Sequence, residues 1–297
     1  MASPRPGRRP AWVDDELLPF ESRFVTVGRH TIHYLDEGEG PLLLLYHGNP
    51  TWSFLYRDVI KGLRAEFRCV AFDYPGMGLS TAGPGYGFRA HEHADVTEQF
   101  LEQLGLDQIT AMVHDWGGPI GLAVATRQPE RHRALIVANT WGWRADTLQT
   151  KVKHRFFSGL WGGPLGRFAT RRFNLFARAV LPAGHKRRRL ASAELAQYLG
   201  PFPDAASRAP CIVLPREIVG ARILLQEVES GLSRLAGHPA LILWADRDFA
   251  FGKRDLARWQ RTLPLQCTRI LEGAGHFLQD DAPDEVCAAI RAWWPPT

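Results

Sequence analysis

Residues 109–121 are Ile-Thr-Ala-Met-Val-His-Asp-Trp-Gly-Gly-Pro-Ile-Gly, an apolar strand pattern that continues into a glycine-rich turn and then a helix. This pattern predicts a nucleophile elbow, in which a tight turn holds its central residue at the top of a sheet and needs small neighbours. The central residue is Asp115. A carboxylate is ionised at neutral pH and can attack a saturated carbon directly, which makes an ester. Taken alone, Asp115 also fits a simpler interpretation as the cap of the following helix.

Short runs of apolar, β-branched or aromatic residues recur on both sides of this turn and alternate with amphipathic stretches of helix length. We expect helices over residues 91–104, 119–128 and 253–262. The alternation is typical of a parallel sheet with crossover helices, and the first two runs, joined at Gly28 and Arg29, predict a hairpin. The expected strands cover residues 23–27, 31–35, 42–47, 68–73, 109–114, 135–139, 240–245 and 268–271.

The alternation stops between residues 144 and 234, where the sequence is helix-prone, rich in Arg and interrupted by Gly and Pro. We interpret this segment as a helical lid inserted into an α/β core that consists of residues 1–143 and 235–297. The lid segment holds 16 Lys/Arg and 6 Asp/Glu, or +10, whereas the whole chain is 36 − 31 = +5. Such a segment can attract an anionic partner, although a solvated helical face is the commoner explanation.

Composition excludes several classes of protein. The chain has 297 residues, of which 45% are hydrophobic, so it can bury a large core. Its apolar runs, such as 42–46, are far shorter than the roughly 20 residues that span a bilayer, and no signal-peptide pattern follows the N-terminus. Four dispersed cysteines without metal-ligand spacing predict reduced thiols, a cytoplasmic protein and no metal. We expect no organic cofactor and no membrane or nucleic-acid partner.

A second chemical signal is an apolar strand followed by His47-Gly-Asn-Pro-Thr-Trp52. In folds with a nucleophile elbow, this turn supplies half of the oxyanion hole, so we expect the backbone N–H groups of Asn49 and Trp116 to hold an oxyanion. Their side chains, an amide and an indole, are neutral donors that could converge on one anion. The alternative is an ordinary Asn-Pro turn and a core tryptophan.

The third signal is His276, which lies in a glycine-rich loop after the last expected strand. A lone loop histidine is usually a surface residue, but its position after the nucleophile in the chain fits a general base. An acid must orient it. The strand after the nucleophile ends at Asn139 and offers no carboxylate, whereas the next strand is followed by Asp246 and Asp248. We choose Asp248, because it lies farther into the loop and can reach back, while Asp246 more plausibly fixes the loop.

From residue 20 onward, the chain resembles the haloalkane dehalogenases of the α/β-hydrolase superfamily. The resemblance implies an eight-stranded, mostly parallel sheet with an inserted helical cap. It assigns Asp115 as nucleophile, His276 as base, and Asn49 and Trp116 as the halide-binding pair. With Asp248 as the acid and Asn139 at the earlier acid position, the chain is similar to the third subfamily. The motifs that carry the resemblance are Ser22-Arg-Phe-Val25, His33-Tyr-Leu-Asp-Glu-Gly38, His47-Gly-Asn-Pro-Thr-Trp-Ser-Phe-Leu-Tyr-Arg57, Asp73-Tyr-Pro-Gly-Met-Gly-Leu-Ser80, Asp115-Trp-Gly-Gly-Pro-Ile-Gly121 and Asn139-Thr-Trp141.

The implied activity is hydrolysis of a halogenated alkane through an alkyl-aspartate ester, giving an alcohol, a halide ion and a proton, without a cofactor. Self-association into a homo-oligomer is a further implication. An epoxide hydrolase is the first alternative, but such enzymes use lid tyrosines, and residues 144–234 hold only Tyr198. Fluoroacetate dehalogenases carry Arg where this chain has Trp116. An inactive binding module of the same fold is the non-enzymatic alternative.

Overall fold

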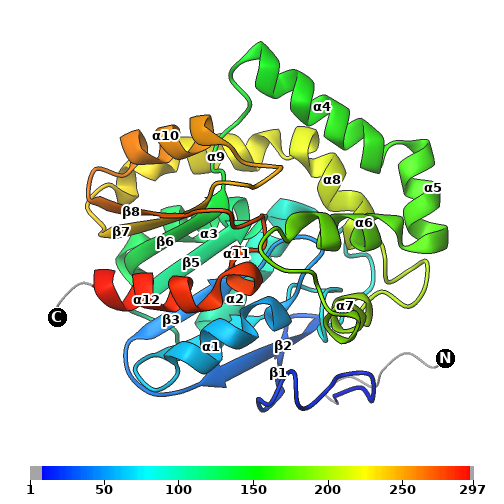
Figure 1. The fold of residues 1–297 in the computed structure, drawn as a ribbon, viewed down its shortest axis with the longest axis horizontal. Coiled ribbons are helices and arrows are strands. Elements are labelled where there is room, and N and C mark those ends of the chain that lie inside the picture. The colour runs from blue at the N-terminus through cyan, green and yellow to red at the C-terminus, as the bar shows by residue number, and fades with distance from the viewer. Residues whose placement is uncertain (1–8, 295–297) are drawn as a thin grey trace.

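The computed structural model describes residues 9–294, and one eight-stranded sheet forms its centre (Figure 1). The strand order is β1-β2-β4-β3-β5-β6-β7-β8. Strand β2 pairs antiparallel with β1 and β4, and all other neighbours are parallel. The strands are β1 (Arg23–Val27), β2 (His30–Glu37), β3 (Leu42–Tyr46), β4 (Arg68–Phe72), β5 (Ile109–Asp115), β6 (His132–Thr140), β7 (Ala240–Ala245) and β8 (Gln266–Leu271).

All eight expected strands are present, and the expected β1–β2 hairpin is confirmed, with Gly28 at φ +56° in its turn. The largest error is at β6, which begins at His132 instead of residue 135. Its polar first residues gave no strand signal, but His132 pairs with Ile109 of β5, so tertiary pairing extends the strand. Strands β3 and β7 are buried at every position, as expected for central strands covered on both faces.

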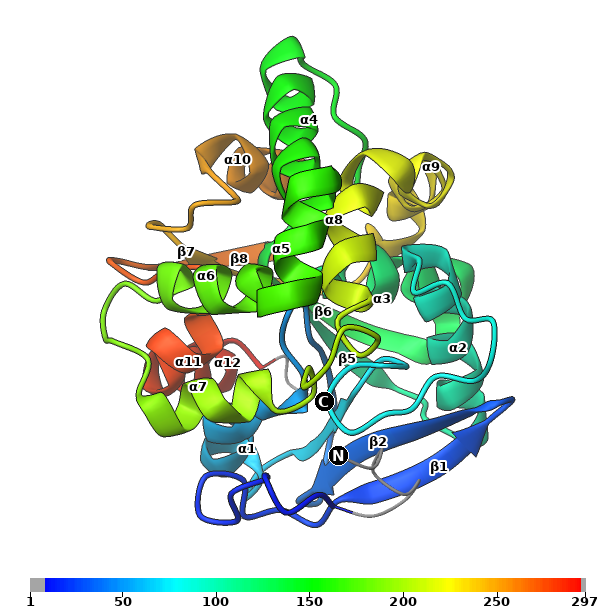
Figure 2. The ribbon, with the colours of Figure 1, turned by 90° about the vertical axis from the view of Figure 1, so that its right-hand side faces the viewer.

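Helices α1 and α12 cover one face of the sheet and α2 and α3 the other, as the two views agree (Figures 1 and 2). The helices of the described residues are α1 (Arg57–Leu63), α2 (Ala90–Gln103), α3 (Gly117–Arg127), α4 (Leu148–Gly162), α5 (Pro164–Phe173), α6 (Leu175–Gly184), α7 (Ser192–Leu199), α8 (Pro210–Gly220), α9 (Arg222–Gly231), α10 (Lys253–Thr262), α11 (Leu278–Asp281) and α12 (Pro283–Trp293). Helix α10 has the same bounds as the helix expected over 253–262. Helices α2 and α3 begin one and two residues before the helices expected over 91–104 and 119–128.

Helices α4 to α9, which we call the cap helices, lie between β6 and β7 in the sequence. They sit over the carboxyl ends of the parallel strands, with α4 rising farthest from the sheet (Figure 2). The chain turns from α4 into α5 at Gly163 and Pro164. Proline suits the first position of α5, because a residue there has no partner within the helix for its N–H.

Strand β3 lies between β4 and β5 in the sheet. The chain leaves β3 toward β4 and leaves the adjacent β5 toward β6, so these two connections run in opposite directions. Open α/β sheets bind ligands at such a switch point, outside the carboxyl ends of the strands. The loop after β3 carries Asn49, and β5 ends at Asp115. The loops after β7 and β8 carry Asp248 and His276 to the same edge.

Candidate active site

Asp115 ends β5 in the left-handed backbone region, at φ +48°, where few residues other than glycine lie. The turn can close because its next two residues have no side chains. A Cβ on Gly117 would lie 2.4 Å from the Tyr46 carbonyl oxygen, and one on Gly118 would lie 1.8 Å from Thr140 Oγ1. Thr140 Oγ1 also donates to the Asp115 carbonyl oxygen at 2.6 Å. Asp115 therefore stands on a strained turn that neighbouring strands hold in place.

The two carboxylate oxygens of Asp115 have different surroundings. The backbone N–H of Asn49 donates to Oδ1 at 2.8 Å, while Oδ2 lies 3.7 Å from His276 Nε2. Burial raises the pKa of Asp115 above its ordinary value, and the nearby His276 and the backbone N–H groups of Asn49 and Trp116 partly oppose this rise. Oδ1 is thus held by the backbone, and Oδ2 is the oxygen left to react.

His276 is 2% exposed and contacts two carboxylates. Its Nδ1 lies 2.9 Å from Asp248 Oδ2, which makes Nδ1–H the donor and leaves Nε2 as the acceptor that faces Asp115. Burial lowers the pKa of His276, but the charges of Asp248 and Asp115 outweigh it, so the pKa lies above the ordinary value. The backbone of His276 is anchored as well, through a 2.8 Å contact from His114 Nε2 to its carbonyl oxygen. This is the arrangement of a general base with an orienting acid.

The two aspartates that follow β7, Asp246 and Asp248, make different contacts. Asp248 Oδ1 accepts the backbone N–H groups of Ala250 at 2.5 Å and Phe251 at 3.3 Å, so both of its oxygens are occupied. Asp246 instead accepts the Gly273 N–H at 2.6 Å from an exposed position. The loop-fixing position expected for Asp246 matches this contact, and Asp248 alone contacts His276.

Sequence reasoning missed the part that Asn139 plays in the site. Its Oδ1 accepts the Ala245 N–H at 2.7 Å, and its Nδ2 donates to Ala245 O at 3.1 Å and to Asp248 Oδ2 at 2.9 Å. Asn139 therefore ties the end of β6 to β7 and orients the acid, although it is not acidic itself. The signal that could have revealed it is its position at the end of a strand beside Asp248, a neighbour relation that only the sheet order supplies.

Asn49 and Trp116 line a cavity of about 90 Å³ that also exposes Asp115 and His276. Asn49 Oδ1 is buried and has no hydrogen-bond partner within residues 9–294; this oxygen is an acceptor, so an anion would have to bind the other amide atom, Nδ2, which donates. The Trp116 indole packs edge-on against Trp141, with ring centroids 4.9 Å apart. The two expected halide-binding side chains thus line one cavity with Asp115. The remaining lining is mostly apolar or aromatic: Trp141, Phe157, Phe176, Val180, Pro215, Ile218, Phe249, Ala250 and Phe251, with Lys153 and His154 from α4.

Tyr198, the single tyrosine of the lid segment, lies outside this cavity. Its hydroxyl donates to Asp280 Oδ2 at 2.9 Å, and Arg57 and His185 contact the same carboxylate at 2.6 Å and 3.2 Å. This buried cluster joins α7 to the core. No phenol therefore faces Asp115 from the cap helices that the structure describes, so the donors that an epoxide hydrolase needs are missing there.

Residues 9–294 hold neither a metal-binding cluster nor a membrane-spanning helix. No group of three or more His, Cys, Asp or Glu side chains could hold a metal ion. No helix in this part of the chain is both long and apolar enough to cross a bilayer. All four cysteines are free.

Comparison with known proteins places this geometry in context. A family model described as alpha/beta hydrolase fold matches residues 41–283. The chain is 44% identical to haloalkane dehalogenase 2 of Mycobacterium tuberculosis, a match that covers 93% of this chain and 96% of the relative. It is 32% identical to a cis-3-alkyl-4-alkyloxetan-2-one decarboxylase of Shewanella oneidensis, with 93% and 89% covered. Among solved structures, a haloalkane dehalogenase from Bradyrhizobium elkani superposes with a TM-score of 0.83 at 25% identity, over 92% of this chain and 97% of the other.

Proposed function

The chain belongs to the haloalkane dehalogenase family of the α/β-hydrolase fold, and on this premise we propose that Asp115, His276 and Asp248 carry out its hydrolysis of carbon–halogen bonds. Asp115 Oδ2 attacks the halogen-bearing carbon in line and displaces the halide. The Asn49 amide and the Trp116 indole donate to the departing ion, so they stabilise charge that grows in the transition state. The product of this first step is an alkyl ester of Asp115 and a bound halide ion.

In the second step, His276 Nε2 takes a proton from water, which attacks the ester carbonyl carbon. The carbonyl oxygen is Oδ1, and the N–H groups of Asn49 and Trp116 hold it as it becomes an oxyanion. Asp248 keeps the Nδ1 proton in place and stabilises the imidazolium. Collapse of the intermediate releases the alcohol and restores the carboxylate. The observation that carries this proposal is the unequal environment of the two Asp115 oxygens, one bound by the Asn49 N–H and the other facing His276.

The test is to remove the base and look for the ester. In His276→Ala, n-butyl bromide should still alkylate Asp115, and the peptide that contains Asp115 should gain the mass of a butyl group. Asp115→Ala should gain nothing. His91→Ala, which removes an exposed histidine of α2 far from the cavity, is the matched control and should turn over normally without a stable adduct. Full turnover by His276→Ala would contradict the assignment of the base.

A second candidate reaction follows from the relatives that decarboxylate oxetan-2-ones, at 32% and 31% identity. Carbon 4 of that ring is saturated and carries a carboxylate leaving group, so Asp115 could open the ring by the same attack. Loss of carbon dioxide then moves the electron pair of the broken C–C bond into a C=C bond and expels the Asp115 carboxylate. This sequence consumes no water and needs no base. His276→Ala should therefore keep a decarboxylase activity while its reaction with alkyl halides stops at the Asp115 ester.

Four further assignments are proposals: the subgroup, the cap domain, the cellular setting and the oligomeric state. We place the chain with the subgroup that combines an Asp acid after β7 with an Asn/Trp halide pair, and we treat residues 144–234 as the cap domain. The four free cysteines of the chain support a reducing, cytoplasmic setting. Self-association is supported by exposed apolar side chains on the cap, Phe156 at 71% and Leu165 at 86% exposure. Light scattering should give a multimer for the parent chain and a smaller mass for Phe156→Glu.

A further inference from the structure

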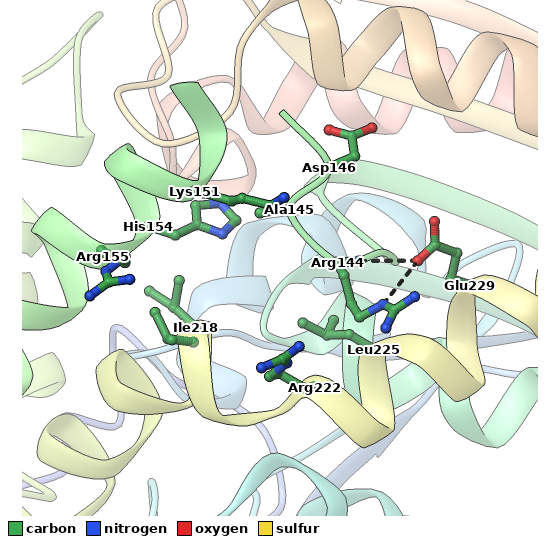
Figure 3. A pocket seen from close by; sticks show the side chains of 11 residues that line it. Arg144, Ala145, Asp146, Lys151, His154, Arg155, Ile218, Arg222, Leu225 and Glu229 are labelled. Atoms are coloured by element: carbon green, nitrogen blue, oxygen red, sulfur yellow. Dashed lines mark hydrogen bonds and ion pairs between the residues drawn. The ribbon is translucent and has the colours of Figure 1, made fainter. Parts of the chain in front are cut away.

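A second cavity, of about 600 Å³, lies between α4, the corner where α8 meets α9, and the loop that leaves β6 (Figure 3). His154 and Ile218 line both this cavity and the one that holds Asp115. The two cavities therefore adjoin at these side chains. The outer cavity thus lies beside the one that holds Asp115, with His154 and Ile218 between them.

The outer cavity carries an excess of positive charge. Lys151, His154 and Arg155 stand at positions i, i+3 and i+4 of α4, which places them on one side of the helix, and Arg222 faces them from α9 (Figure 3). Within residues 9–294, Lys151, Arg155 and Arg222 have no ion pair with an acidic side chain. These three cations are free to bind an anion.

The two acidic side chains of the cavity are already neutralised by arginines. Arg258 contacts Asp146 at 2.8 Å and Glu229 at 2.6 Å, and Arg144 lies 3.8 Å from Glu229. Their charge is therefore not available to balance the three free cations. The outer cavity therefore has a net positive charge, and because Lys151, Arg155 and Arg222 are exposed, salt should screen it.

Apolar side chains complete the outer cavity. Ile218, Val219 and Leu225 line it beside the cations, and Ile218 continues into the inner cavity. A ligand that fits both features has an anionic head and an alkyl stem. The inner cavity is lined by one lysine, Lys153, which donates to the Ala250 carbonyl oxygen, and Trp116 rather than an arginine follows Asp115.

We propose that the outer cavity binds the anionic group of halogenated alkyl substrates that carry a carboxylate or sulfonate at the end opposite the halogen. The alkyl chain passes between His154 and Ile218 and brings the halogen-bearing carbon to Asp115. The anion must be distal, since a carboxylate adjacent to the reacting carbon would lie in the inner cavity without a guanidinium partner. This inference rests on the proposed dehalogenation and adds a substrate class to it.

The kinetic test compares ω-bromooctanoate with n-octyl bromide, which have alkyl chains of equal length. The parent enzyme should show the higher kcat/KM with the bromoalkanoate. In the double variant Arg155→Gln/Arg222→Gln, kcat/KM for the bromoalkanoate should fall roughly tenfold, as expected for the loss of two partly solvated charge-assisted contacts. Turnover of n-octyl bromide should not change. The matched control is Arg171→Gln/Arg178→Gln, which removes the same charge from exposed cap positions outside both cavities and should leave both substrates unaffected.

An equilibrium measurement separates this site from the chemistry. Octanoate, which has no halogen, should bind the parent enzyme in calorimetry, bind more weakly as salt screens the charges, and lose roughly tenfold in affinity in Arg155→Gln/Arg222→Gln. If octanoate binding behaves in this way but neither bromide is hydrolysed, the outer site stands and the proposed dehalogenation fails. The inference is overturned if the parent does not favour the bromoalkanoate, if both double variants lose activity equally, or if only inhibition by bromide ion changes.

Discussion

Asp248→Asn tests the proposed role of Asp248, because it changes which ring nitrogen of His276 carries the proton. The Asp248 side chain is 0% exposed and accepts four donors. Oδ1 receives the backbone N–H groups of Ala250 and Phe251, and Oδ2 receives His276 Nδ1–H and the Asn139 amide. An asparagine has only one oxygen, so one pair of donors must face its NH₂ group.

The two orientations of the new amide differ in cost. With its NH₂ group toward the loop, it opposes two backbone donors that cannot change. With its NH₂ group toward His276 and Asn139, only the Asn139 amide remains opposed, because imidazole can move its proton to Nε2 and accept at Nδ1. The second orientation therefore prevails. His276 then carries its proton on Nε2, where it can no longer accept one from water.

The expected loss falls on the second step alone. Removal of a positioned general base costs roughly 10²–10⁴ in rate, which is about 3–5 kcal/mol at 1.36 kcal/mol for each factor of ten. Ester formation needs no base and should continue. The remaining mismatch at Asn139 should lower the free energy of unfolding by about 1–3 kcal/mol, the cost of one buried unsatisfied donor.

Rapid mixing with n-butyl bromide measures both steps. Asp248→Asn should release one halide per active site in a fast burst and then turn over slowly. Asp246→Asn is the matched control, because Asp246 contacts only the Gly273 N–H among these loops, and its turnover should stay within about twofold of the parent. A burst that disappears together with turnover, or steady-state turnover within about tenfold of the parent, would refute the tautomer argument.

Three other perturbations have defined outcomes. Gly118→Ala should deform the elbow, because its Cβ would lie 1.8 Å from Thr140 Oγ1, and should lower both the melting temperature and the rate of halide release. The rate of ester hydrolysis should fall as pH decreases, because only the neutral His276 imidazole accepts a proton; Asp248 raises the pKa of His276, whereas the charge of Asp115, which also raises it in the free enzyme, is lost in the ester, and a pH–kcat profile without an acid limb would contradict this. Asp280→Ala should lower the free energy of unfolding in urea by about 1–3 kcal/mol, since it leaves the buried Tyr198 hydroxyl without its acceptor, while Arg57 keeps Glu194 and Asp58; a loss below about 1 kcal/mol would mean that the buried carboxylate is not stabilising.

Much of the active site was predictable because its chemistry is local. The alternation of strands and helices predicted every strand of the sheet, and Gly117 and Gly118 beside Asp115 predicted the elbow, since only glycine fits so close to Tyr46 and Thr140. The order of nucleophile, acid and base along the chain predicted that Asp248 and His276 would meet. Strand ends were less predictable, as β6 shows, because pairing with β5 can extend a strand past its apolar residues.

What the amino-acid sequence determined by itself was the set of reactive groups and the turns that present them, because these depend on neighbours within a few residues. The tertiary structure alone decided which oxygen of Asp115 the Asn49 N–H binds, that Asn139 supports Asp248 across two strands, and that cations of α4 and α9 line a cavity beside the one that holds Asp115. The hydrogen bonds among them join residues 66 and 109 positions apart in the sequence. No pattern of spacing encodes them, because they form only when the sheet and the cap helices come together.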